Sequence, residues 1–125
     1  MKTNRGVRRV VAVAILVLAC SDPSGTDGRI ETVDGLLARI CALAAECAGI
    51  TASAADVAAC PAGLRAELSQ NQLQELEGFA SYTKTQQDHV LQCIGSAICG
   101  RFGGALSNMS DSDIMDPYRG CLGSA

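Results

Sequence analysis

Apolar residues recur at alternating steps of three and four along most of the chain after residue 29, which is the spacing of one buried face of an α-helix. These apolar stripes cover residues 30–47, 57–68, 73–82 and 90–98. Gly49 follows the first stripe and is a natural stop for a helix. A last short helix is expected from Ser110 toward Cys121. No segment alternates apolar and polar residues with period two, so the pattern predicts no β-sheet.

Capping and breaking residues mark the boundaries of these helices. Residues suited to cap a helix N-terminus, each three positions before an acid, occur at Ser53–Asp56, Thr85–Asp88 and Ser110–Asp113. Pro61 predicts either a kink or a helix that begins near it, and Pro117 can interrupt the last helix. Gly78 weakens the third helix. The sequence therefore predicts an all-α, disulfide-stapled domain over residues 30–125, with four or five helices in two hairpins.

The first twenty residues have the pattern of an export signal. Residues 1–9 are basic, and residues 10–19 form an unbroken apolar run of ten. A membrane-spanning helix needs about 20 apolar residues, so the run fits the hydrophobic region of a signal peptide. The run ends in Val-Leu-Ala followed by Cys20, which resembles the lipobox of bacterial lipoproteins. The resemblance implies that residues 1–19 are removed and that Cys20 is diacylated on its sulfur, with palmitate as a suitable label.

The residues after Cys20 bear on where the protein resides. By resemblance to lipoprotein sorting, Ser21 favours the outer membrane of the bacterial envelope. Ordinary cleavage at the same bond is the alternative, and it would give a secreted protein with an odd cysteine. Residues 20–29 are rich in Ser, Asp, Gly and Pro and are predicted to be a flexible tether. Such a tether holds the helical domain close to the membrane surface.

The charge of the chain differs sharply between its two parts. The whole chain has ten basic and thirteen acidic side chains, and four of the basic ones lie in residues 1–19. The remainder therefore has six basic and thirteen acidic side chains, a net charge of −7. Nucleic-acid binders present clustered Lys and Arg, and anionic lipid headgroups attract basic segments. The mature chain is thus not expected to bind nucleic acid, and its membrane contact is expected through the lipid at Cys20.

Six cysteines remain after Cys20, and their spacing repeats. Cys41 and Cys47 have five residues between them and lie at the end of an apolar helix, and Cys60 follows them. Cys93 and Cys99 have the same spacing and the same place in a later helix, and Cys121 follows them. In a helical hairpin, residues equally distant from the loop face one another. With loops near residues 49–51 and near residue 107, this geometry pairs two cysteines within each hairpin. The remaining cysteine of one hairpin is then expected to bond to the remaining cysteine of the other. The predicted bridges are Cys41–Cys60, Cys93–Cys121 and Cys47–Cys99.

Other uses of these cysteines are less consistent with their spacing. Structural zinc sites place cysteines two to four residues apart, and dithiol redox enzymes use Cys-x-x-Cys; neither pattern occurs.

Asp111, Asp113 and Asp116 could supply oxygen ligands, but the glycine and glutamate of a helix–loop–helix calcium loop are missing. The sequence therefore predicts structural disulfides, no metal and no cofactor.

No constellation for catalysis stands out. His89 is the single histidine, and an enzyme would have to combine it with an acid such as Glu75 or Asp88. The prediction is a non-catalytic envelope lipoprotein whose domain binds another envelope or extracellular protein. One alternative is a carrier that holds a lipid or other apolar ligand between the two hairpins. The other alternative is a small hydrolase-like enzyme that uses His89.

Overall fold

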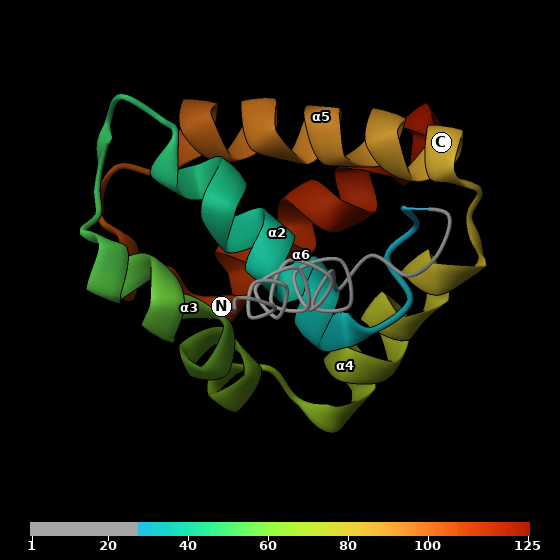
Figure 1. The fold of residues 1–125 in the computed structure, drawn as a ribbon, viewed down its shortest axis with the longest axis horizontal. Coiled ribbons are helices and arrows are strands. Elements are labelled where there is room, and N and C mark those ends of the chain that lie inside the picture. The colour runs from blue at the N-terminus through green and yellow to red at the C-terminus, as the bar shows by residue number, and fades with distance from the viewer. Residues whose placement is uncertain (1–27) are drawn as a thin grey trace, which may run out of the picture.

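A computed structural model describes residues 28–125, which form five α-helices (Figure 1). Cys20, the predicted signal peptide and most of the predicted tether lie outside the described residues. The α-helices are α2 (Val33–Ala45), α3 (Ala54–Glu67), α4 (Gln70–Glu77), α5 (Lys84–Arg101) and α6 (Asp111–Cys121). Three short 3-10 helices also occur, η1 (Gly78–Ser81), η2 (Leu106–Asn108) and η3 (Leu122–Ser124). The predicted all-α fold is confirmed.

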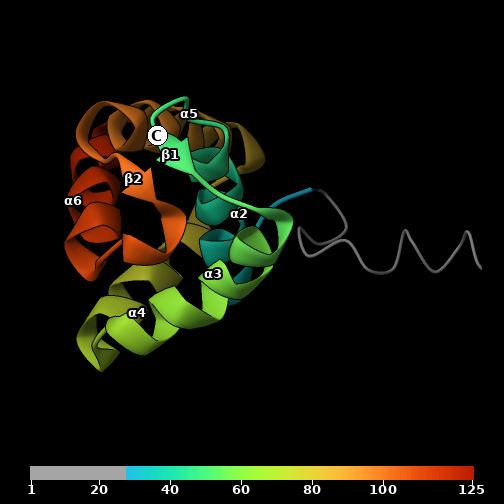
Figure 2. The same cartoon turned by 90° about the vertical axis from the view of Figure 1, so that its left-hand side faces the viewer.

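The helices are arranged as two hairpins joined by a short connector. Helix α2 packs against α3, and α5 packs against α6. Helix α4 and η1 connect the hairpins, and α2 also contacts α5 and α4. Figures 1 and 2 place α3 and α4 at the side of the molecule opposite α5. Helix α2 is therefore central, whereas α3 lies at the periphery.

A minimal parallel β-pair contradicts the expectation of no β-sheet. Strand β1 (Ile50–Thr51) pairs with β2 (Gly104–Ala105), and the Gly104 N–H donates to the Gly49 carbonyl at 2.9 Å. Gly104 has a φ of 110°, which is accessible to glycine at little cost. Each strand has two residues, too few for a period-two pattern to exist. The pair joins the loops of the two hairpins.

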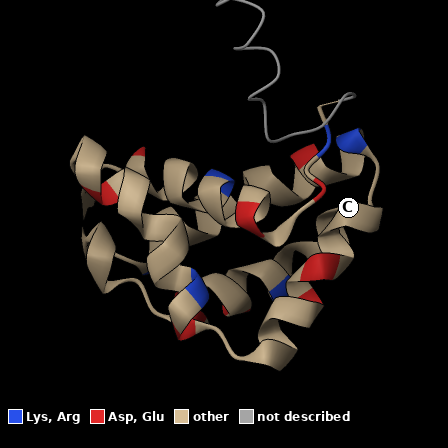
Figure 3. Ribbon diagram, turned by 60° about the horizontal axis from the view of Figure 1, so that its bottom comes forward, with Lys and Arg blue, Asp and Glu red and all other residues tan. Residues whose placement is uncertain are grey.

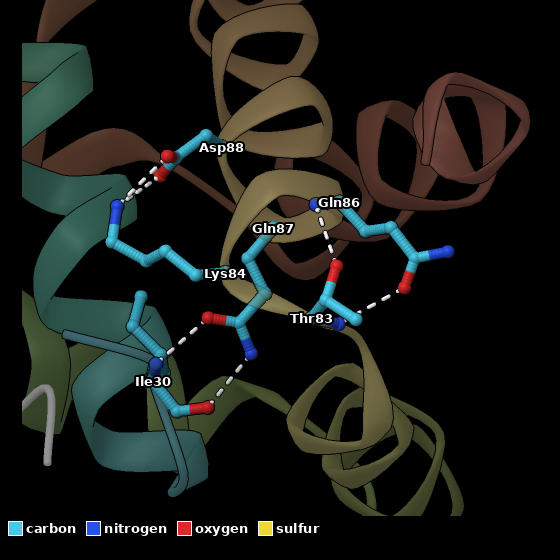
Figure 4. Close-up of polar contacts among 6 residues, drawn as sticks. All are labelled: Ile30, Thr83, Lys84, Gln86, Gln87 and Asp88. Atoms are coloured by element: carbon cyan, nitrogen blue, oxygen red, sulfur yellow. Dashed lines mark hydrogen bonds and ion pairs between the residues drawn. The ribbon is translucent and has the colours of Figure 1, made fainter. Parts of the chain in front are cut away.

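Two of the three predicted caps are confirmed, and one is wrong. Ser53 with Asp56 and Ser110 with Asp113 form reciprocal capping boxes. Helix α5 is capped by Thr83 instead of Thr85: the Thr83 side chain accepts from the Gln86 N–H, and Gln86 Oε1 accepts from the Thr83 N–H at 2.9 Å (Figure 4). Glutamine serves in a capping box as well as an acid does. The carboxylate of Asp88 instead binds Lys84 one turn before it.

The two helix prolines do not end their helices. Helix α3 continues through Pro61, and α6 continues through Pro117, so the predicted interruption of the last helix is wrong. Each proline lies in a stretch held by burial and by a disulfide: Cys60 precedes Pro61, and Cys121 follows Pro117 by one turn. Tertiary contacts thereby offset the lost backbone hydrogen bond. Gly78 acts as expected, because α4 ends just before it and the chain continues as η1.

The core is built from the predicted apolar stripes. The six residues that define the first stripe are all buried, and Leu36 and Cys41 widen it: Ile30, Val33, Leu37, Ile40, Ala44 and Cys47. Aliphatic residues of α5 and α6 close the core from the other hairpin. Ile30 is 4% exposed and is the first buried residue of the described chain. Gln87 is the single buried polar or charged side chain among the described residues.

The buried amide of Gln87 binds the start of the domain to α5. The Ile30 N–H donates to Gln87 Oε1 at 2.7 Å, and Gln87 Nε2 donates to the Ile30 carbonyl at 2.9 Å (Figure 4). The same Nε2 donates to the Phe79 carbonyl at 3.0 Å. The side chain thus satisfies two backbone groups that come from a segment 57 residues away in sequence.

Candidate functional site

All six cysteines of the domain are in disulfide bonds. Cys41 is bonded to Cys60, Cys47 to Cys99 and Cys93 to Cys121, with Cα–Cα distances of 6.1, 5.3 and 5.7 Å. These distances lie within the ordinary range for disulfides. The pairs are the same three that the spacing predicts. Two bridges each staple one hairpin, and the third joins the hairpins, so none of these sulfurs is available as a nucleophile or a metal ligand.

The acids proposed for an enzyme that uses His89 are occupied by cations. His89 lies exposed on α5. Both carboxylate oxygens of Asp88 accept hydrogen bonds from Lys84 Nζ, at 2.7 and 2.8 Å. Both oxygens of Glu75 accept from Arg119, each at 2.8 Å. Within residues 28–125, no hydrogen bond or ion pair joins His89 to either acid.

The three aspartates of α6 each have a structural partner. Asp111 accepts a hydrogen bond from Gln72 at 3.0 Å, which links α6 to α4. Asp113 accepts the Ser110 N–H at 2.8 Å and lies 3.9 Å from Arg101, and Asp116 lies 3.3 Å from Arg101. Among residues 28–125, no group of three or more His, Cys, Asp or Glu side chains is arranged to hold a metal ion.

Polar contacts also fix α6 against α4. The Tyr118 hydroxyl donates to the Glu75 carbonyl at 3.3 Å, and burial raises the pKa of Tyr118 to about 12, with smaller effects from Tyr82 and Glu75. The hydrogen bonds from Arg119 hold the pKa of Glu75 below its usual value, and the same bonds raise the pKa of Arg119. Figure 3 shows acidic and basic positions spread over several helices. These groups act as cross-links between helices.

The surface helix α3 differs from the other four α-helices in how little of it is buried. Of its fourteen residues, only Cys60 and Leu64 are buried. Much of its exposed surface consists of alanines and Gly63. Helices of globular proteins are stabilised mainly by burying an apolar face, and α3 has little buried area. The Cys41–Cys60 bridge and the ion pair of Arg65 with Asp34, at 2.7 Å, hold it against α2. The Ser53–Asp56 capping box closes its N-terminus.

A groove runs along one side of α3. Its volume is 270 Å³, and its opposite wall is formed by η2 and the residue that follows it, Met109. Buried apolar side chains, including those of Leu64 and Leu106, form the floor. Asp56 lies at one end and Glu67 at the other, eleven residues apart on α3. At 1.5 Å per residue their backbones are about 16 Å apart along the helix axis. We call this feature the α3 groove.

The size of the α3 groove limits what it can hold. Enclosed sites for small molecules and cofactors usually have volumes of about 300 to 1,000 Å³, and the α3 groove is smaller and open to solvent. Three other depressions on the described surface are more open still. The α3 groove is therefore a shallow feature of the surface and not an enclosed pocket.

Comparison with protein-family models, with curated proteins and with solved structures finds no match to this chain. Separately, no helix within residues 28–125 is both long and apolar enough to cross a membrane.

The α3 groove is the feature that the sequence pattern did not reveal. The pattern places Cys60 and Leu64 on the apolar side of the helix, and both are buried. Periodicity cannot show that Leu106 and Met109, more than forty residues later, form the facing wall. The sequence nevertheless contains a signal of the groove. Two small residues one turn apart, Ala59 and Gly63, lie between the acids Asp56 and Glu67 on one face of the helix.

Proposed function

We propose that this protein is a non-catalytic lipoprotein of the bacterial envelope, held in the outer membrane by lipid at Cys20, whose helical domain binds another envelope or extracellular protein. The observation that carries the binding part is the exposed helix α3 with its groove. The domain maintains a helix that contributes few buried residues and fixes it with a disulfide. An exposed helix that is held by a disulfide can contact a partner with little rearrangement of its backbone.

The chemistry of the domain supports binding over catalysis. The six sulfurs are in disulfide bonds. The two acids that an enzyme could combine with His89 are in ion pairs, Asp88 with Lys84 and Glu75 with Arg119. Catalysis near neutral pH usually needs a positioned acid or base with a tuned pKa. A carrier of apolar ligands would need an enclosed cavity between the hairpins, where the described residues instead place buried side chains.

Lipid attachment predicts a specific labelling result. Cells that express the full chain should incorporate labelled palmitate into it, and the label should disappear in Cys20→Ala, because Cys20 is the proposed acylated residue. Cys47→Ala is the matched control, and it should retain the label because this cysteine lies inside the folded domain. Labelling that survives in Cys20→Ala would contradict the lipid anchor.

Photo-crosslinking in intact cells tests the binding function. A photoreactive residue placed at Ala62 on α3, at Asn71 on α4 or at Gln92 on α5 samples three exposed surfaces. The proposal predicts a discrete crosslink to one envelope or extracellular protein from at least one position, lost when Cys20→Ala removes the anchor. Absence of any protein crosslink from all three positions would contradict the binding function.

A further inference from the structure

We infer that the α3 groove is the docking surface for a basic segment of the partner protein, with an apolar side chain seated at the centre and a Lys or Arg at each end. This inference rests on the proposed binding function and names the chemistry of the partner. It follows from the shape of the groove and from the charges at its two ends.

The groove follows a single face of α3. Its α3 residues follow Asp56 by three, four, seven, eight and eleven positions, which places them on one side of a helix. They are Asp56, Ala59, Cys60, Gly63, Leu64 and Glu67. The order along this face is an acid, small residues above a buried apolar floor, and a second acid. One binding surface therefore extends along nearly the whole helix.

Small residues keep the centre of the groove open. Ala59 and Gly63 are exposed and lie one turn apart. A Cβ atom built at Gly63 would meet no other atom within 4 Å, so the space beside it is unfilled. Leu64 and Leu106 below are 3% and 1% exposed. An apolar side chain entering here would contact carbon atoms on both sides and would gain free energy by leaving water.

The two acids at the ends have no cation of their own. Within residues 28–125, no ion pair reaches Asp56 or Glu67, whereas five of the six basic side chains there are already in ion pairs. Glu67 also occupies the last turn of α3, where the helix dipole disfavours negative charge. A cation from a partner would give each acid an ion pair and would offset the unfavourable interaction of Glu67 with the helix dipole.

Charge also selects among the possible occupants. The mature chain has a net charge of −7, which repels anionic lipid surfaces and nucleic acids and attracts basic protein segments. An extended segment advances about 3.3 Å per residue, so two cations five residues apart match a groove about 16 Å long. The expected ligand is a short extended segment with this spacing and with leucine-like residues between the cations.

Three blocked synthetic peptides are the probes for this inference. The first is Lys-Ser-Leu-Leu-Ser-Lys, and the other two have Gln or Glu in place of both Lys residues. Each carries a fluorophore, and its anisotropy is titrated with the purified lipid-bearing protein in detergent micelles. The Lys peptide should bind about ten-fold more tightly than the Glu peptide, because two exposed charge contacts change sign, and raising the salt concentration should reduce the difference.

Two pairs of variants localise the binding to the groove. Ala59→Leu fills the groove and should weaken Lys-peptide binding at least ten-fold, whereas Ala62→Leu, exposed on α3 but outside the groove, should leave it unchanged. Glu67→Gln should weaken it roughly two- to five-fold, whereas Glu46→Gln at another exposed acid should not. Circular dichroism of all four variants confirms that the fold is retained.

The outcomes separate this inference from the proposed function. Failure of the Lys peptide to bind, equal binding of the three peptides, or equal effects of Ala59→Leu and Ala62→Leu would overturn the groove assignment. Preferential binding to vesicles of phosphatidylethanolamine and phosphatidylglycerol, competed by none of the peptides, would overturn it as well. A protein crosslink from Ala62, Asn71 or Gln92 alongside any of these results would leave the binding function standing without the groove.

Discussion

The double variant Cys47→Ala, Cys99→Ala is expected to lose about 4 kcal/mol of unfolding free energy, because this bridge closes the longest loop of the domain. The two residues are 52 apart in sequence, compared with 19 and 28 for the other bridges. In the chain-entropy account, a longer loop restricts the unfolded chain more. Small domains have total stabilities of about 5–15 kcal/mol, so the loss is a large fraction. Urea unfolding followed by circular dichroism measures it.

The bridge within the first hairpin provides the comparison. Cys41→Ala with Cys60→Ala opens a loop of 19 residues and should cost about 3 kcal/mol. This variant should also release α3 selectively, since only Cys60 and Leu64 of that helix are buried. Hydrogen exchange of the α3 amides should accelerate more than that of α5 amides. A loss below about 1 kcal/mol for the Cys47–Cys99 variant would contradict the loop-closure account.

Replacement of Gln87 by leucine is expected to cost about 3 kcal/mol, because it leaves buried backbone groups without hydrogen-bond partners. Leucine retains an apolar side chain of similar reach but provides neither the acceptor for the Ile30 N–H nor the donors for the Ile30 and Phe79 carbonyls. Gln87 is 1% exposed, so water cannot readily replace it. Chemical denaturation gives the change in stability, and the Ile30 amide should lose its protection from hydrogen exchange.

Gln92→Leu is the matched control for this substitution. Gln92 lies on the same helix but is exposed, and surface changes of this kind usually alter stability by less than about 0.5 kcal/mol. Equal effects of Gln87→Leu and Gln92→Leu would show that the amide contacts with Ile30 do not stabilise the domain. A specific effect of Gln87→Leu would show that Ile30, the first buried residue of the described chain, is anchored to α5.

Local patterns were sufficient to predict most of the fold. The apolar stripes depend on the helical repeat alone, and residues such as Leu37 and Ile40 are fully buried where the stripe places them. The three cysteine pairs follow from hairpin geometry, because loop positions determine which residues face one another. The cap of α5 was misplaced by two residues, since Thr83–Gln86 and Thr85–Asp88 both satisfy the capping pattern and only packing decides between them.

Contacts between distant segments could not be predicted in the same way. The pairing of β1 with β2 joins residues 54 positions apart, as Ile50 pairs with Gly104. The contact of Gln87 with Ile30 spans 57 positions, and the sequence alone does not distinguish Gln87 from the polar residues around it. The α3 groove depends likewise on which loop lies beside Ala59 and Gly63. These features arise from the docking of the two hairpins, which periodicity does not encode.

The central claim is that every cysteine of the domain serves its structure, which leaves a stapled helical module for binding. Non-reducing peptide mapping of the protein isolated from the cells that express it, with free thiols alkylated before digestion, tests this claim most directly. The account predicts three linked peptide pairs, Cys41 with Cys60, Cys47 with Cys99 and Cys93 with Cys121, and no alkylated cysteine among the six. An alkylated thiol at any of these positions would contradict it.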